Sequence, residues 1–237
     1  MSKHLVRDLE NLQRHILSMA GAVEDAIYKS TQAISEGSLV LAEEVISGDN
    51  RIDAFDNALT EECLKMMALH QPVAVDLRRI ATVFMITSDL ERMGDLAVDI
   101  AQRAVAIGAL SSGMIPESFG RMTDQTTAMV RMALDAFVNL DSKAARRVIR
   151  LDDEVDRFNS EIIDELMIRM KATPDKIDTC LSLFSAVRHL ERIGDHATNI
   201  AERVHFAVTG DNLPDERPKS DVSAYAVVRV PSSERSS

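Results

Sequence analysis

Apolar residues recur every three or four positions along most of the chain, which is the spacing of one buried face on an α-helix. The pattern predicts a first helix over residues 4–35 and a second over residues 39–70. Pro72 ends the second helix, because a proline ring cannot continue the hydrogen-bond ladder and restrains the residue before it. A third helix is predicted over residues 73–110, so the first half of the chain contains three helices.

The second half shows the same order of elements. A fourth helix is predicted to begin near Pro116, and a turn at residues 139–142 separates it from a fifth helix that ends near residue 171. The sixth helix ends near residue 210. Helices of about 30 residues are too long to be stable singly, and short connections make neighbouring helices antiparallel. We therefore expect an all-α fold of two tandem antiparallel three-helix bundles related by an internal pseudo-repeat.

The expected division of the chain follows the repeat. A first bundle is predicted over residues 1–112 and a second over residues 113–211, with a Ser-Ser-Gly linker at residues 111–113 between them. Residues 212–237 contain three prolines and several serines, and we expect them to form a mobile tail.

The repeat is visible in the residues themselves. Leu-Glu-Arg-Met-Gly-Asp at residues 90–95 returns as Leu-Glu-Arg-Ile-Gly-Asp at residues 190–195, an offset of 100. Upstream, residues 42–46 return in similar form at residues 145–149, each followed by a pair of aspartates. Two blocks repeated in the same order indicate a duplicated unit.

The repeated blocks are rich in carboxylates at helical spacing, so several acids share one side of each helix. Antiparallel neighbours bring such rows opposite each other, and two unit charges 4 Å apart repel by about 4 kcal/mol at an effective dielectric of 20. Hard cations prefer oxygen ligands of this kind. The candidate metal ligands are Asp49, Asp53, Glu91, Asp95 and Asp99 in the first half, and Asp152, Asp156, Glu191 and Asp195 in the second.

A glycine accompanies each row of acids. Gly94 and Gly194 lie in the middle of predicted helices, where glycine costs about 1 kcal/mol relative to alanine, and each follows a glutamate by three residues. The missing side chain leaves room for a neighbouring backbone or a bound ion. The alternative is a solvated acidic face whose charges pair with arginines three residues away, such as Arg92 with Asp95.

Composition excludes several classes of function. The chain carries 27 Lys and Arg against 38 Asp and Glu, a formal net charge of −11, which disfavours nucleic acid and anionic membrane surfaces as partners. Its two cysteines stand apart, so neither a disulfide framework nor a zinc knuckle is expected. Uncharged runs, of which residues 80–88 and 104–116 are examples, are too short to span a membrane. We expect a cytoplasmic protein.

The two hexapeptides and the segment Pro-Val-Ala-Val-Asp-Leu-Arg-Arg-Ile at residues 72–80 resemble the signature motifs of the PhoU family. The resemblance covers about residues 3–208. It implies two tandem three-helix bundles and metal binding by carboxylate motifs, with iron, zinc, manganese or magnesium as the candidate ions. The implied ligands are all the carboxylates named above except Asp99, which stands where the second half has Asn199.

The resemblance also implies a function. Family members are negative regulators of phosphate uptake and of the phosphate-starvation response, and they link the ATPase subunit of the phosphate ABC transporter to a sensor histidine kinase. They are usually homodimers and are not known as enzymes. Two other hypotheses stay open from the residues alone: a metalloenzyme with a multinuclear carboxylate site, and a metal-free helical scaffold.

Overall fold

The computed structural model describes residues 3–108 and 114–213, and all of the long elements in this part of the chain are helices. The all-α tandem fold predicted from the sequence is confirmed. The helices are α1 (Lys3–Glu36), α2 (Leu39–His70), α3 (Val75–Ile107), α4 (Glu117–Asn139), α5 (Ser142–Ala172) and α6 (Ile177–Thr209), with a short 3₁₀ turn, η1 (Pro174–Lys176), before α6. The predicted linker and residues 214–237 of the predicted tail lie outside the described residues.

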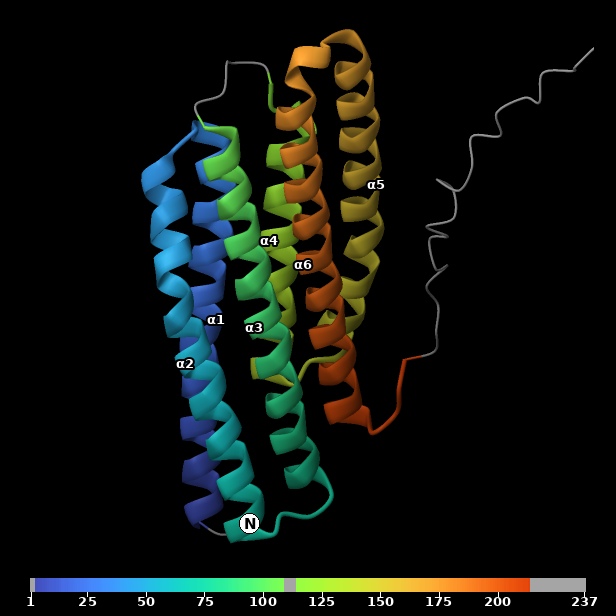
Figure 1. Ribbon diagram of the computed structural model, residues 1–237. Coiled ribbons are helices and arrows are strands. Elements are labelled where there is room, and N and C mark those ends of the chain that lie inside the picture. The colour runs from blue at the N-terminus through green and yellow to red at the C-terminus, as the bar shows by residue number, and fades with distance from the viewer. Residues whose placement is uncertain (1–2, 109–113, 214–237) are drawn as a thin grey trace, which may run out of the picture.

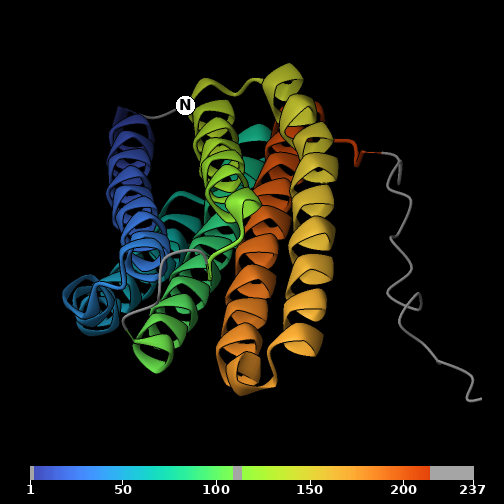
Figure 2. The same cartoon turned by 90° about the horizontal axis from the view of Figure 1, so that it is seen from above.

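The six helices form two three-helix bundles joined side by side (Figure 1). Helices α1, α2 and α3 make the first bundle and α4, α5 and α6 the second. Helices α3 and α6 pack along each other at the centre, with α2 and α5 on the two outer sides (Figure 2). Contact between α1 and α4 is small, so the seam between the bundles is formed mainly by α3 and α6.

Local chemistry sets several of the helix ends. The Ser38 hydroxyl accepts a hydrogen bond from the backbone N–H of Leu41 at 3.4 Å, which caps α2. The Asp141 carboxylate accepts hydrogen bonds from the N–H groups of Lys143 and Ala144, at 2.9 and 3.0 Å, and caps α5. These hydrogen bonds, that of Ala144 first, lower the pKa of Asp141. Gly210, with φ of +81°, ends α6 in a left-handed conformation that suits glycine.

Helix α3 begins two residues later than predicted, and Ala74 explains the difference. Ala74 has φ of +46° and ψ of −108°, a conformation that an L side chain rarely adopts, so the helix cannot start before Val75. We expect Ala74→Gly to raise the free energy of unfolding by about 1 kcal/mol, because glycine adopts this conformation without strain. Urea denaturation measures the change.

The matched control for this substitution is Ala58→Gly, on an exposed part of α2. There glycine should lower the free energy of unfolding by about 1 kcal/mol, the usual helix-propensity cost. Equal destabilisation at both positions would contradict strain at Ala74.

The seam contains a buried ion pair at its centre. The Asp89 side chain of α3 is only 6% exposed; its Oδ2 lies 2.6 Å from Nε of Arg203 and its Oδ1 lies 3.0 Å from Nδ1 of His196, both on α6. By helical spacing from Asp89, the residues Met93, Leu96 and Ile100 share this face of α3, and they are almost completely buried. The seam therefore combines buried apolar side chains with a buried ion pair.

Candidate metal centres

The first acidic groove lies between α2 and α3, which run antiparallel. It brings Asp49 and Asp53 of α2 close to Glu91 and Asp95 of α3. Burial raises the pKa of Asp49, and the negative charges of Asp53 and Asp95 raise it further. The pKa of Glu91 is raised in the same way, by burial first and then by Asp95, with the cation of Arg92 opposing the shift. The predicted ligands of the two helices therefore interact electrostatically.

Asp56 belongs to this groove as well. Burial and the charge of Asp53 raise its pKa, and its charge acts on Glu91. It stands three residues after Asp53, on the same side of α2, so helical spacing was sufficient to find it.

The second acidic groove lies between α5 and α6 and is centred on Glu191, whose side chain is 14% exposed. Burial raises the pKa of Glu191 to about 7; Arg188 opposes the shift, and the charges of Asp195, Asp156 and Asp152 add to it. Arg188 Nη1 donates a hydrogen bond to Oε1 of Glu191 at 3.0 Å. Oε2 is buried and has no hydrogen-bond partner among the described residues. A buried carboxylate oxygen without a donor is the type of group that a cation would stabilise.

Asp99 turns away from the first groove. Its Oδ2 lies 3.7 Å from Nδ1 of His189 on α6, so it faces the seam. The reason is helical geometry: eight residues after Glu91, the direction of the side chain has rotated by about 80°.

The donor atoms of both grooves suit a hard cation. Each groove offers carboxylate oxygens from two helices, and these negative charges repel one another when no cation is present. In residues 3–108 and 114–213, however, no three Asp, Glu, His or Cys side chains are close enough together to hold a metal ion in the conformations seen. Side-chain rotation toward the groove axis would be needed to complete a coordination shell.

The two glycines face side chains rather than backbone or an open ion site. A Cβ at Gly94 would lie 3.0 Å from Cδ1 of Ile52, which is a core residue. A Cβ at Gly194 would lie 3.5 Å from Cγ1 of Val155 and 3.6 Å from Oδ1 of Asp152, both ordinary contact distances. The repeated glycine is thus required sterically only in the first half.

This asymmetry predicts opposite results for two equivalent substitutions. Gly194→Ala should stabilise the protein by about 0.5–1 kcal/mol through helix propensity. Gly94→Ala should destabilise it by about 1 kcal/mol, because Ile52 must move in a packed core. Thermal and urea unfolding of the two variants measure the difference, and the same sign for both would contradict it.

Sequence reasoning missed the role of Asp89. It precedes Glu91 by two residues and has a histidine, His189, as its counterpart in the second half, so the repeat did not point to it. A carboxylate in one repeat matched by a histidine in the other indicates that the two repeats make different contacts across the seam. His196, whose counterpart in the first half is Leu96, contacts Asp89 through Nδ1.

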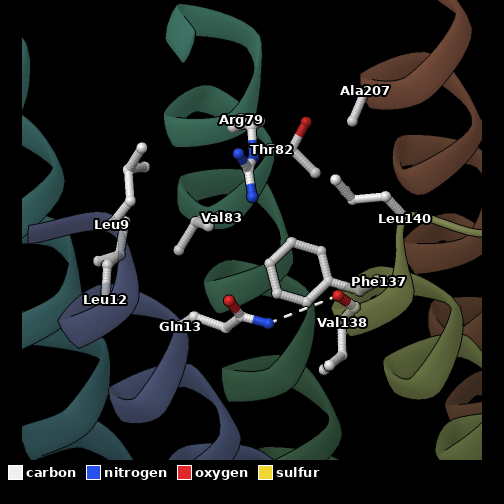
Figure 3. Close-up of a pocket in the computed structure, with 10 residues that line it drawn as sticks. All are labelled: Leu9, Leu12, Gln13, Arg79, Thr82, Val83, Phe137, Val138, Leu140 and Ala207. Carbon is white, nitrogen blue, oxygen red and sulfur yellow. Dashed lines mark hydrogen bonds between the residues drawn. The ribbon is translucent and has the colours of Figure 1, made fainter. Parts of the chain in front are cut away.

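A small cavity lies where α1, α3, α4 and α6 meet (Figure 3). Its walls are mainly apolar, including Leu12, Val83 and Phe137, and Gln13 Nε2 donates a hydrogen bond to the Val138 carbonyl at 3.5 Å beside it. The volume of about 30 Å³ is room for one or two water molecules rather than for an organic substrate.

No helix in the described parts of the chain combines the length and apolarity that crossing a membrane requires.

Comparison with known proteins gives consistent matches to both halves. The model of the PhoU domain matches residues 16–104 and again residues 119–204. A phosphate-specific transport system accessory protein PhoU homolog from Caulobacter vibrioides is 36% identical over 227 residues, covering 94% of this chain and 99% of the relative.

Two crystal structures also match. PhoU from Pseudomonas aeruginosa aligns with a TM-score of 0.81 at 36% identity, over 86% of this chain and 99% of that protein. The phosphate transport system regulatory protein PhoU from Streptococcus pneumoniae aligns with a TM-score of 0.82 at 25% identity, over 89% and 99%.

Proposed function

The chain belongs to the PhoU family, and from this membership we propose that it is a negative regulator of phosphate uptake and of the phosphate-starvation response. In this proposal it is a cytoplasmic adaptor that contacts the ATPase subunit of the phosphate ABC transporter and the sensor histidine kinase, and it acts as a homodimer without catalysing a reaction. The relatives support this reading because they are named as accessory or regulatory proteins of phosphate transport.

We further propose that the two acidic grooves bind metal ions, with iron, zinc, manganese and magnesium as candidates. The observation that supports this most directly is Glu191: a buried carboxylate with a raised pKa, an oxygen without a hydrogen-bond donor and three acidic neighbours. A bound cation would neutralise the repulsion between α5 and α6 and between α2 and α3. The ion would then stabilise the bundles and help set the shape that a partner recognises.

The regulatory function is tested in cells that lack this chain. We expect a phosphate-starvation reporter to be active at high phosphate in the deletion strain, and to be repressed again when the wild-type chain is restored. Normal repression at high phosphate without the chain would remove the proposed function.

The metal proposal is tested separately on protein purified without chelators. Elemental analysis should find bound metal in the wild type and less in Glu91→Gln combined with Asp95→Asn. Asp99→Asn is the control: it removes one charge from α3, on the side of the helix that faces the seam, and it should keep the metal. Wild-type protein that binds none of the four candidate ions would support a metal-free scaffold.

A further inference from the structure

In both repeats, exposed apolar side chains continue the line of the acids along the central helices. In α3, Leu77 and Phe84 are each 41% exposed, and Glu91 follows Phe84 after another seven residues. In α6, Ile177 and Phe184 are 39% and 37% exposed, and Glu191 again follows seven residues later. Seven residues are about two helical turns, so each set lies along one side of its helix. The exposed phenylalanine is therefore part of the duplicated pattern.

The flanking helix adds an apolar side chain to the first groove. Ile52 lies opposite Gly94, and Cys63 Sγ donates to the Ile80 carbonyl at 3.9 Å, which fixes the register of α2 against α3. In this register Leu64, which is 54% exposed, is at the level of the turn between Ile80 and Phe84.

The second groove has its apolar side chains on α6. Val155 lies opposite Gly194, and the charge of Asp156 acts on Glu191, which fixes the register of α5 against α6. Leu181, which is 51% exposed, lies three residues before Phe184 on α6 and adds an apolar side chain to this groove. Ile168 of α5 is at the level of Leu181 but lies twelve residues after Asp156, about 120° around the helix from it, and so outside the groove. Each groove thus has an acidic part and, about two turns away, an apolar part.

We propose that each of these acid–apolar grooves binds an amphipathic helical segment of a partner protein. The apolar stripe of that segment covers Phe84 and Leu64 in the first groove, and Phe184 and Leu181 in the second. Lysine or arginine side chains about two turns further along face the carboxylates around Glu91 or Glu191. The inference rests on the proposed adaptor function only in that a partner exists, and it concerns grooves without bound metal, because an ion on the same carboxylates would compete with the basic side chains.

The charges of the grooves favour a basic amphipathic helix as the occupant. Large exposed apolar side chains grouped next to charged ones are typical of protein-binding surfaces, and a helix laid in a groove uses anchors at this spacing. The carboxylates in both grooves and the net charge of −11 favour a basic segment and repel nucleic acid or an anionic membrane. A second copy of the chain would set acid against acid if two such grooves met.

The pseudo-repeat adds a prediction about stoichiometry. The two grooves carry the same pattern at equivalent positions of two related bundles, so one chain offers two similar sites. A partner that is itself a symmetric dimer could occupy both with identical segments.

The test uses a synthetic amphipathic peptide of leucine and lysine, about 18 residues long, with one tryptophan on its apolar face. The protein contains no tryptophan, so the peptide alone reports binding through a shift of its emission to shorter wavelength. We expect two peptides to bind per chain, and a version with glutamate in place of lysine to bind much more weakly. Phe84→Ser combined with Phe184→Ser should weaken binding at least about tenfold, as expected for the loss of aromatic anchors.

The matched control is Leu17→Ser combined with Val208→Ser, two side chains of similar exposure, 40% each, outside the grooves. Circular dichroism confirms that both double variants are folded. The proposal is overturned if the phenylalanine variant binds the lysine peptide as tightly as the control variant does, because the binding would then be a general effect of net charge. It is also overturned if the glutamate peptide binds equally well.

The same variants separate this inference from the proposed function. Cells in which Phe84→Ser with Phe184→Ser abolishes repression at high phosphate, while the control variant keeps it, support the groove as the partner surface. Full repression by the phenylalanine variant, together with unchanged peptide binding, rejects the groove and leaves the regulatory function in place.

Discussion

The Glu191→Gln variant is expected to be more stable than the wild type at pH 8, by up to about 3 kcal/mol, when metal is removed with a chelator. Burial and the neighbouring acids raise the pKa of Glu191 to about 7 from an ordinary value of 4.5. The folded protein therefore binds a proton that the unfolded chain has already lost between these pH values. Glutamine keeps the shape of the side chain and an oxygen that can accept the hydrogen bond from Arg188, without the buried charge.

The pH dependence gives this prediction a definite sign. Below about pH 4.5 the carboxyl is protonated in both the folded and the unfolded state. The difference in stability between the two proteins should therefore not change with pH in this range. As pH rises from 4.5 to 7, the wild type loses stability relative to the variant, and above pH 7 the difference is constant. Urea denaturation at several pH values measures it.

The control for this substitution is Glu43→Gln, which removes a charge from an exposed part of α2 and should change stability by less than about 0.5 kcal/mol at any pH. A Glu191→Gln variant that is less stable than the wild type at pH 8 would contradict this prediction. It would show that the attraction between Arg188 and the Glu191 carboxylate exceeds the cost of burying that charge beside three aspartates.

Removal of another buried acid should have the opposite effect. Asp89→Ala is expected to lower the free energy of unfolding by about 3 kcal/mol at pH 7.5. Its carboxylate is 6% exposed and lies between Arg203 and His196, so its loss leaves the Arg203 cation unpaired in the seam. Arg203 keeps 29% exposure, which places the expected cost near the lower end of the range for buried pairs.

Asp99 provides the matched comparison on the same helix. It also faces a histidine of α6 across the seam, but it is 45% exposed and the separation is 3.7 Å. Asp99→Ala should therefore cost less than about 1 kcal/mol. Equal effects of the two substitutions in urea denaturation would mean that the Asp89 ion pair adds nothing beyond a surface interaction.

The sequence was sufficient to predict the fold because its signals agree with one another. Helical periodicity, the proline after residue 71 and the duplicated hexapeptide together indicate six helices in two similar units, and the six helices of the described residues lie within a few residues of their predicted bounds. The start of α3 differs because the positive φ of Ala74 is a property of the connection, which periodicity does not report.

The candidate site was predictable only in part, because spacing gives the side of a helix but not what packs against it. The carboxylates of Glu91 and Asp95 lie in the same groove as the carboxylates of α2, as their spacing indicates. Asp99 lies outside that groove because it has drifted around the helix toward α6, and no rule from one helix alone shows where a third helix will lie. Asp89 was missed for the same reason: its partners come from the other repeat.

The seam also has a consequence for the two halves taken separately. If the first half were expressed alone, two copies could pair through α3, and Asp89 of one would meet Arg103 of the other, because Arg103 is the counterpart of Arg203. Two copies of the second half would instead place His189 against Arg203, with no carboxylate between them. The charges at the seam therefore favour a self-complementary pair of first halves and disfavour a pair of second halves.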